Sequence, residues 1–442
     1  MSEQKLVRCL SWLIAGILVL LPFHALLTTW AASNFGHFDW WRIWKDLLIA
    51  AMAVPAAWLA WRQPKLRQWL ATSWITKLIG LYFILYLLMA GWALIHQQAN
   101  GQAVIYSLII NLRFFSFFLV CLLVATYSDW LKRNYTWLLL GPAAGVILFG
   151  LVQKLLLPLD WLRHLGYGQQ TIPAYQTVDA NIDFRRLQST MRGANPLGAY
   201  LTIIIPALIS ARVTILQNFK HLKWLMLALG LIVLYFTYSR SAWLGVALAV
   251  GLTIWWSVKQ KKRGWRLIGL GMAGVFTAGG LLLVNNSAYF EKTFLHTNQT
   301  STASQSSNSK RLKALKAASL EVINQPLGRG TGTAGPASVR NDGHHPRIAE
   351  NYYLQIGQEV GILGVALFIA INILLARHLW RQRRDALSKV LLASLAGISL
   401  INLLSHAWTD DSLSLIWWGL AGVAIGSTLL NNKLKLNKRN ST

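Results

Sequence analysis

Acidic residues and cysteines are scarce in this sequence. Among 442 residues there are 15 Asp and Glu and two Cys, against 42 Lys and Arg, so the formal charge is +27. Cys9 and Cys121 both lie in apolar runs, where a free cysteine behaves as a small hydrophobic residue, and they give no indication of redox chemistry. Most Lys and Arg lie in short loops between apolar runs, which is typical of cytoplasmic membrane loops. We therefore expect no nucleic-acid partner.

The sequence also lacks a soluble domain and any internal repeat. Hydrophobic residues make up 55% of the chain and recur in runs of about twenty, the length that one bilayer crossing needs. A short basic start and a long apolar run without a cleavage site predict a retained first helix. We predict an all-α, polytopic helical bundle that forms a single transmembrane domain, residues 1–442. About twelve spans are expected, at residues 9–30, 45–61, 75–95, 103–126, 135–155, 195–212, 222–238, 241–257, 266–284, 350–376, 388–407 and 412–430.

The basic loops predict the orientation of the chain in the membrane. Each cluster of Lys and Arg precedes the first span, follows an even-numbered span or follows the last one. Because cytoplasmic loops carry the excess of Lys and Arg, both termini are predicted to be cytoplasmic. Two long polar loops, at residues 156–194 and 285–349, then lie outside. The basic clusters are Lys5 and Arg8; Arg62, Lys65 and Arg67; Lys132 and Arg133; Arg212, Lys220 and Lys223; Lys259, Lys261, Lys262, Arg263 and Arg266; Arg377, Arg381, Arg383 and Arg384; and Lys433, Lys435, Lys438 and Arg439.

The second outer loop contains a short amphipathic segment. It begins with the polar tract TNQTSTASQSSNS, which is unlikely to fold alone, and continues as KRLKALKAASLEVINQ. Apolar residues recur there at helical spacing, which predicts an amphipathic helix lying on the outer face of the membrane. These apolar residues are Leu312, Leu315, Ala318, Val322 and Ile323.

The stretch from Glu350 to Gly364, ENYYLQIGQEVGILG, stands where this loop meets an apolar span. A carboxylate at the mouth of a transmembrane helix suggests chemistry at the membrane surface. Asn351 and Tyr353 are predicted to contact substrate, although tyrosines at this depth are as often ordinary interface aromatics. His345, one of a histidine pair before Glu350, is a candidate for proton transfer or substrate contact. No Cys or Asp arrangement completes a metal site there.

Arginines are unexpected in the predicted outer loops, because such loops are normally poor in basic residues. Arg192 precedes the span at 195–212, Arg240 lies in the tight turn before 241–257, Arg311 begins the amphipathic segment and Arg186 lies in the first outer loop. A guanidinium binds phosphate or pyrophosphate with two parallel hydrogen bonds. The alternative is that these side chains extend to lipid phosphates. The outer turn Asp410–Asp411 is interpreted as solvated, with a smaller chance of contacting substrate.

Two ionisable residues are expected inside spans. Arg113 lies in the middle of YSLIINLRFFSFFLV, where a charge is costly unless it is functional or paired. Glu359 is its predicted partner. Glu359 is nine residues after Glu350 and therefore on the opposite helical face, so it is expected to brace the helix. Gly357, Gly361 and Gly364 are predicted to form one helical face for close packing.

The motifs together resemble a known family. In the O-antigen ligase and O-antigen polymerase superfamily of bacterial membrane glycosyltransferases, the signature is a His, an Asn or similar residue, nine residues, Gly, two residues and Gly. Here Asn351 is followed by nine residues, Gly361, two residues and Gly364. The segments RGANPLGAYL, YSRSAWLG and KRLKAL…INQPLGRGTG agree with the family in the same order. The resemblance covers roughly residues 185–375 by motif and the rest by architecture.

This resemblance implies transfer of a glycan from a polyprenyl-pyrophosphate carrier at the outer face of the bacterial cytoplasmic membrane. The acceptor would be lipid A–core, a second carrier-linked glycan or a protein hydroxyl. By resemblance, Arg192 and Arg240 would hold the pyrophosphate, and the signature position would activate the acceptor. No nucleotide, metal or other cofactor is expected. Glu350 stands where the family has His. A carboxylate can also act as a general base, and the change leaves a polymerase, or a ligase with an acceptor other than lipid A–core, at least as well supported.

Two other functions stay open. A transporter or flippase of lipid-linked glycan should carry charged residues deep in several spans and show a pseudo-repeat. Only Arg113 and Glu359 meet the first condition, and no repeat is visible. A membrane scaffold in a polysaccharide assembly complex would tolerate the loss of Glu350, Arg192 and Arg240 together.

Overall fold

The computed structural model describes residues 2–178, 181–210, 220–257 and 307–439, and nearly all of their regular structure is helical. The all-α prediction is therefore confirmed. The two strands, β1 (Gln176–Val178) and β2 (Asn181–Arg186), form one small antiparallel sheet. The helices are α1 (Glu3–Leu20), α2 (His24–Phe35), α3 (Phe38–Arg42), α4 (Trp44–Arg62), α5 (Pro64–Thr72), α6 (Trp74–Ile95), α7 (Gly101–Ala125), α8 (Trp130–Leu155), α9 (Ala194–Ser210), α10 (Lys220–Phe236), α11 (Arg240–Ser257), α14 (Ser307–Asn324), α15 (Tyr352–Arg381), α16 (Ala386–Leu404) and α17 (Asp411–Arg439).

Seven helical segments in the described part of the chain are long and apolar enough to cross a membrane, so this is a multi-pass membrane protein. They comprise α6, α7, α8, α15, α16, the first part of α17, and α1 with α2, which a short 3₁₀ turn joins. The expected spans at 195–212 and 222–238 correspond to the shorter apolar helices α9 and α10. The span expected at 266–284 lies outside the described residues. Twelve remains a prediction for the total number of spans.

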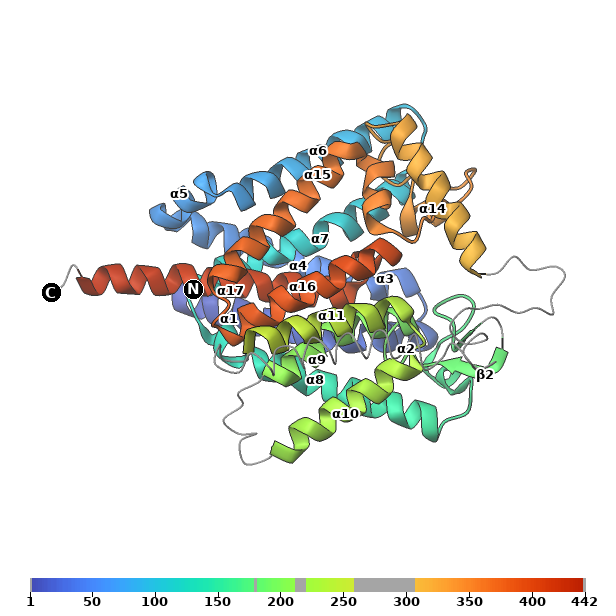
Figure 1. The fold of residues 1–442 in the computed structure, drawn as a ribbon. Coiled ribbons are helices and arrows are strands. Elements are labelled where there is room, and N and C mark those ends of the chain that lie inside the picture. The colour runs from blue at the N-terminus through green and yellow to red at the C-terminus, as the bar shows by residue number, and fades with distance from the viewer. Residues whose placement is uncertain (1, 179–180, 211–219, 258–306, 440–442) are drawn as a thin grey trace.

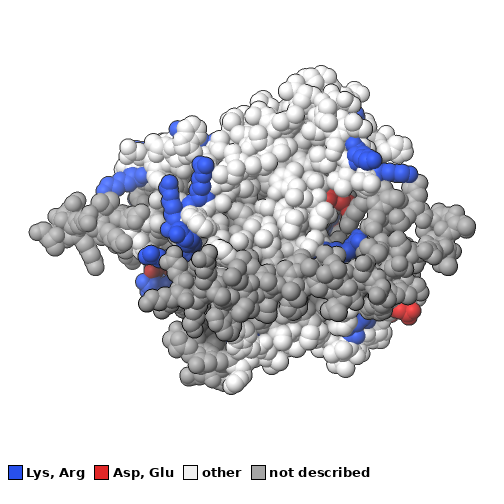
Figure 2. All heavy atoms as spheres, in the orientation of Figure 1, with Lys and Arg blue, Asp and Glu red and all other residues white. Residues whose placement is uncertain are grey.

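The two ends of the bundle carry different helix ends and loops. In Figure 1 the start of α1 and the end of α17 lie at one end, whereas α3, β2 and α14 lie at the other. Ion pairs connect the basic loops at the first end: Arg62 Nη1 lies 3.8 Å from Glu3 Oε1, and Lys132 Nζ lies 3.3 Å from Asp385 Oδ1. Among the described atoms of the visible face, Figure 2 shows charged side chains towards both ends and uncharged residues between them. The described parts of the two predicted outer loops therefore lie at the end of the bundle opposite the start of α1 and the end of α17.

Helices α7 and α17 form the centre of the bundle, because most of their residues are buried, whereas α6 and α8 are largely exposed on their outer sides. Glycines on α17 allow this close approach. A Cβ at Gly422 would lie 2.3 Å from the Phe118 carbonyl oxygen of α7, and one at Gly426 would lie 2.3 Å from that of Leu122. Small residues serve the same purpose at many membrane helix interfaces. Packing against α7 places the first residue of α17 at the end of the bundle opposite the chain termini.

Helix α15 is broken in its first third. Val360 and Gly361 are not helical, and Gly361 has φ +74° and ψ −175°, a conformation open in practice only to glycine. The loop after α14 enters this break: the Gly330 N–H donates to the Glu359 carbonyl oxygen (2.9 Å), and the Ile362 N–H donates to that of Pro326 (2.8 Å). The loop thus supplies hydrogen bonds that the interrupted helix lacks.

This break corrects the prediction for the three glycines. Gly357, Gly361 and Gly364 do not share one smooth helical face, because the backbone changes direction between the first and the last of them. Each still lies where a side chain would collide. A Cβ at Gly361 would lie 2.4 Å from the Pro326 carbonyl oxygen, and one at Gly357 would lie 2.9 Å from Val322 Cγ2.

Candidate functional site

Arg186 ends β2 and connects three parts of the chain. Its Nε donates to the Thr237 carbonyl oxygen (3.0 Å) in the turn between α10 and α11, and its Nη2 donates to Asn195 Oδ1 (2.6 Å) at the start of α9. The next N–H, of Leu187, donates to the Phe236 carbonyl oxygen (2.8 Å). Arg186 therefore holds the first outer loop against the beginnings of α9 and α11.

Arg240 is the first residue of α11, directly after this turn, and its side chain is half-buried. Tyr238 in the turn has φ +49°, an uncommon conformation for a residue with a side chain. A Cβ on Gly198 of α9 would lie 2.5 Å from Ala242 Cβ of α11, so the two helices touch close to their N-termini. The structure thus brings Arg240 to the same region as Arg186 and the start of α9.

Arg192 lies just before α9, and a buried carboxylate orients it. Its Nε donates to Asp410 Oδ2 (2.7 Å); the Asp410 side chain is 6% exposed and that of Arg192 is 38% exposed. Asp410 Oδ1 also accepts the N–H groups of Ser412 and Leu413 at the start of α17 (3.1 and 3.3 Å). No hydrogen bond from the two Nη groups of Arg192 to any described residue is found. Arg192 is therefore fixed on its inner edge, and its outer edge is available to an anion.

Asp411 is the centre of a second charge cluster, which corrects two predictions. It pairs with Arg113 Nη2, with Lys45 Nζ (2.8 Å) and with His24 Nε2 (3.2 Å), and Arg113 also donates to the Thr409 carbonyl oxygen (2.9 Å). Arg113 is thus not paired with Glu359. The turn before α17 is likewise not simply solvated, because both of its aspartates hold buried or half-buried cations. Packing of α17 along α7 places these charges next to each other, although they are far apart in sequence.

Glu359 lies at the break in α15 and is fully buried. Its Oε1 accepts the Ser107 hydroxyl (2.7 Å) and the Gly332 N–H (2.8 Å), and its Oε2 accepts the Asn111 amide (3.2 Å). These contacts connect α15 to α7 and to the loop after α14, as expected for a residue that braces the helix.

Glu350 and Asn351 stand at the start of α15. Glu350 is half-buried and has φ +49°, which is uncommon for a residue with a side chain and is often found at functional sites. Asn351 is the N-cap: its Oδ1 accepts the Leu354 N–H (3.0 Å), and its amide donates to the Leu403 carbonyl oxygen (3.0 Å). The Tyr352 N–H donates to the Ser405 carbonyl oxygen (3.1 Å). Glu350 is therefore held against the same turn, between α16 and α17, that positions Arg192 through Asp410.

The three other predicted site residues differ in what the structure shows of them. The Tyr353 hydroxyl reaches the Ser399 carbonyl oxygen (3.5 Å) on α16. His345 is exposed in the loop before Glu350. The backbone of Arg311 belongs to α14, but its side chain lies outside the described residues.

The loop that leads to Glu350 is anchored on its outer side by Arg340. The Arg340 guanidinium donates to Asp39 Oδ1 (2.8 Å) and lies over the ring of Tyr106, with Cζ 4.5 Å from the ring centroid. Arg42 Nη2 donates to the Tyr106 hydroxyl (2.8 Å). The hydrogen bond from Arg340 is the main reason why the pKa of Asp39 lies below its usual range. These contacts connect the loop to α3 and α7.

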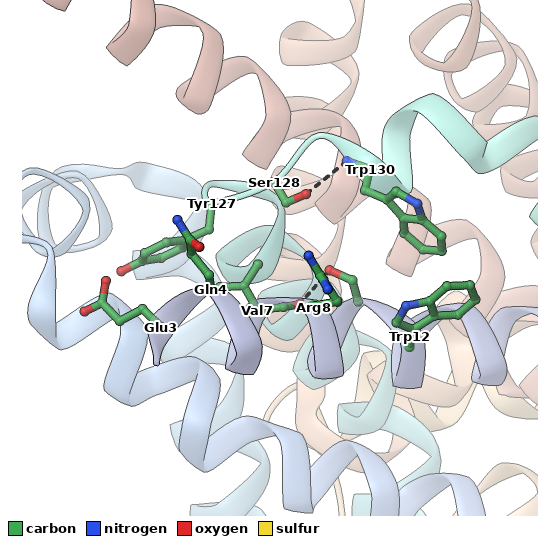
Figure 3. Close-up of a pocket in the computed structure, with 9 residues that line it drawn as sticks. Glu3, Gln4, Val7, Arg8, Trp12, Tyr127, Ser128 and Trp130 are labelled. Carbon is green, nitrogen blue, oxygen red and sulfur yellow. Dashed lines mark hydrogen bonds between the residues drawn. The ribbon is translucent and has the colours of Figure 1, made fainter. Parts of the chain in front are cut away.

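A cavity of about 670 Å³ lies at the opposite end of the bundle, between the start of α1 and the turn from α7 to α8 (Figure 3). Arg8, Trp12, Tyr127 and Trp130 are among its lining residues. It lies at the end that carries the N-terminus, so it is separate from the site around Arg192 and Arg240.

A family comparison bears directly on this arrangement. Residues 225–369, about a third of the chain, match the family model described as O-antigen ligase. The chain therefore contains an O-antigen ligase domain. No curated protein matched the chain. The O-antigen ligase domain includes Arg240, Glu350, Asn351 and Tyr353, whereas Arg186 and Arg192 precede it and are brought to it by the fold.

Sequence reasoning missed the part of Asp410 and Asp411 in this site. A signal was present, since two adjacent acids in a predicted outer turn stand out in a chain with only 15 acidic residues. Their partners were not recognisable, because Arg192 is 218 positions from Asp410 and Arg113 is 298 positions from Asp411.

Proposed function

We propose that the protein transfers a glycan from a polyprenyl-pyrophosphate carrier to an acceptor hydroxyl at the outer face of the cytoplasmic membrane, without a metal ion. The observation that supports this most is the half-exposed guanidinium of Arg192, which the buried Asp410 orients while its outer edge stays available. The O-antigen ligase domain supports the class of reaction. The basic loops at the end that carries the termini support the outer location of the site.

The site suits a leaving group with negative charge. Helices α9, α11, α15 and α17 all begin around the turn between α16 and α17, and helix N-termini favour anions. In the proposed step the bond between the first sugar carbon and the carrier pyrophosphate breaks while the acceptor oxygen bonds to that carbon. Arg192 and Arg240 stabilise the departing pyrophosphate. Glu350 takes the proton of the acceptor hydroxyl as general base.

In this proposal Arg186 and Asn351 position the residues that act on the substrate. Arg186 holds the turn that carries Arg240, and Asn351 fixes the first turn of α15 beside Glu350. His345, Tyr353 and Arg311 are proposed contacts for the glycan or its acceptor, because they belong to the loops and helix around this site. The sugar, the acceptor, and the choice between ligase and polymerase are left open.

The test is a reconstituted transfer assay with purified full-length protein and carrier-linked glycan. Removal of a general base typically lowers a rate by about 10²–10⁴-fold, and removal of one charge-stabilising donor by about 10²–10³-fold. Glu350→Gln and Arg240→Ala should show losses in these ranges, with normal expression and thermal unfolding. Asp342→Asn and Arg163→Ala are the controls for these two changes, because both residues are exposed in the two predicted outer loops.

Full activity in Glu350→Gln or Arg240→Ala would overturn the mechanism. The same vesicles also report the alternative activity: carrier-linked glycan that crosses the membrane without being joined to an acceptor would indicate a flippase. In a deletion strain, long chains unattached to their acceptor would indicate a ligase, whereas single repeat units would indicate a polymerase.

A further inference from the structure

Helix α14 runs across the direction of the membrane-spanning helices at the end of the bundle away from the termini (Figure 1). It spans Ser307–Asn324 and leads into the loop that fills the break in α15. A helix in this orientation cannot cross the bilayer with the others. It has to cover the end of the bundle, lie on the membrane surface, or do both with different faces.

One face of α14 packs on α15. Ala318 is 3% exposed, and Val322 lies against Gly357, where a Cβ would come within 2.9 Å of its side chain. Glu321 Oε2 accepts a hydrogen bond from Gln358 Nε2 (2.6 Å). These residues fall on one side of the helix and connect it to the segment of α15 between Glu350 and the break.

A second face of α14 carries large apolar side chains that the bundle leaves uncovered, together with exposed Lys316. Leu312, Leu320 and Ile323 are 55%, 59% and 69% exposed. At 100° per residue, these three side chains fall within an arc of roughly 80°, separate from the face that packs on α15. The helix expected from the sequence is confirmed. The structure divides its apolar residues: Ala318 and Val322 belong to the packed face, and Leu312 and Ile323 to the exposed one.

The exposed face continues into the surface that faces lipid. Leu327, just after α14, is 81% exposed, and its backbone lies against Gly361. The next residues of α15, Ile362 and Leu363, are 52% and 55% exposed on a helix long and apolar enough to span the membrane. The uncovered leucines thus extend the lipid-facing side of α15 around the rim of the bundle. Lys313 and Lys316 are exposed on the same helix.

We propose that α14 docks on the outer surface of the lipid bilayer. Leu312, Leu320, Ile323 and Leu327, here called the docking stripe, insert among the lipid chains just below the headgroups, and Lys313 and Lys316 contact anionic phospholipid headgroups. At 100° per residue, Lys316 falls inside the arc of the stripe and Lys313 roughly 20° beyond Leu320. Lysines at such positions bury their alkyl chains and extend their ammonium groups to the headgroups, as on other interfacial helices. Because α14 also holds α15, docking fixes the depth of the segment that begins at Glu350. This inference is independent of the reaction proposed above.

Spin labels on α14 test the proposal. The full-length protein, with exposed Cys9 replaced by Ser and buried Cys121 retained, receives one nitroxide at Leu320→Cys, Ile323→Cys or, as the matched control, Ala317→Cys. Ala317 is exposed and lies away from the docking stripe. Each protein is reconstituted in vesicles of phosphatidylethanolamine and phosphatidylglycerol. Labels at 320 and 323 should lie about 5–10 Å below the headgroup boundary and should therefore be relaxed mainly by oxygen dissolved in the lipid. The label at 317 should be relaxed mainly by an aqueous nickel chelate.

Two results would overturn the proposal. Labels at 320 and 323 that are as accessible to the nickel chelate as the label at 317 would place the stripe in water. Labels shielded from both reagents, with dipolar broadening between them, would instead indicate a second copy of the chain. The headgroup contact has its own test, the double variant Lys313→Glu and Lys316→Glu. It should move the stripe labels towards water in phosphatidylglycerol vesicles but not in vesicles of phosphatidylcholine alone, and an unchanged depth in both would refute that contact.

Discussion

The pair formed by Arg192 and Asp410 gives the most direct prediction about the site. Asp410→Asn keeps an oxygen that accepts the N–H groups at the start of α17, but it removes the charge that orients the guanidinium. Asp410→Ala removes both. Arg192→Ala removes the cation itself, and the variant with both positions changed to Ala completes a double-mutant cycle.

The expected size follows from the contacts. A hydrogen bond to a charged group contributes about 1.5–3 kcal/mol, and exposure of Arg192 reduces this to about 1–2 kcal/mol because water screens the pair. Since 1.36 kcal/mol changes a rate tenfold, Asp410→Asn should lower kcat/KM for the carrier-linked donor by roughly 5–30-fold. Arg192→Ala should lower it by about 10²–10³-fold. Once Arg192 is absent, Asp410→Ala should add little, because the acid acts through the arginine.

The assay is transfer at varied donor concentration, with thermal unfolding recorded for every variant. The control is Asp160→Asn, which removes an exposed acid paired with Arg163 at 3.2 Å in the first outer loop and should leave the reaction unchanged. Wild-type kinetics in Asp410→Asn would refute the positioning role. Fully additive losses in the double-mutant cycle would refute it as well, because they would mean that the two side chains act separately.

Three further predictions concern stability, each measured by thermal unfolding in detergent. Gly361→Ala should lower the free energy of unfolding by more than the 1–3 kcal/mol typical of a strained backbone, since its Cβ would also collide with a carbonyl oxygen at 2.4 Å. Gly141→Ala is the control, because a Cβ there would have nothing within 4 Å, and it should be neutral or stabilising. Equal effects of the two changes would contradict a strained backbone at the break. Glu359→Ala should cost about 3 kcal/mol, because it leaves the buried Ser107 hydroxyl and the Gly332 N–H without an acceptor. Glu359→Gln should fall between it and wild type, and a neutral Glu359→Ala would show that this carboxylate is not needed for stability. Arg340 lowers the pKa of Asp39 in the folded state, so this ion pair stabilises the protein above the unfolded pKa of about 3.9 and loses that effect as the pH falls through the folded value. Asp39→Asn should therefore lower the melting temperature slightly at pH 7 and not at all in strong acid, whereas a difference that persists in acid would contradict this origin.

The sequence alone determined the fold class and pointed to the region of the candidate site. Apolar runs of bilayer length require helices, because a backbone in lipid has to satisfy its own hydrogen bonds. The prediction that these apolar runs are helical is therefore confirmed wherever the structure describes them. The spacing from Asn351 to Gly364 pointed to the family, and residues 225–369 match it. These are local properties, which consecutive residues carry with them.

Only the tertiary structure decided which charges meet and where α15 breaks. Arg113 pairs with Asp411 rather than Glu359 because α17 packs along α7, and no sequence pattern encodes that choice. Gly361 reads as a packing glycine in the sequence, but a loop arriving from α14 turns it into a break by supplying hydrogen bonds from outside the helix. The faces of α14 were also decided by its neighbour, because helical spacing shows which residues share a side and not which side α15 covers. In each case the deciding interaction joins segments that are distant in the chain, and its free energy exists only after the helices have packed.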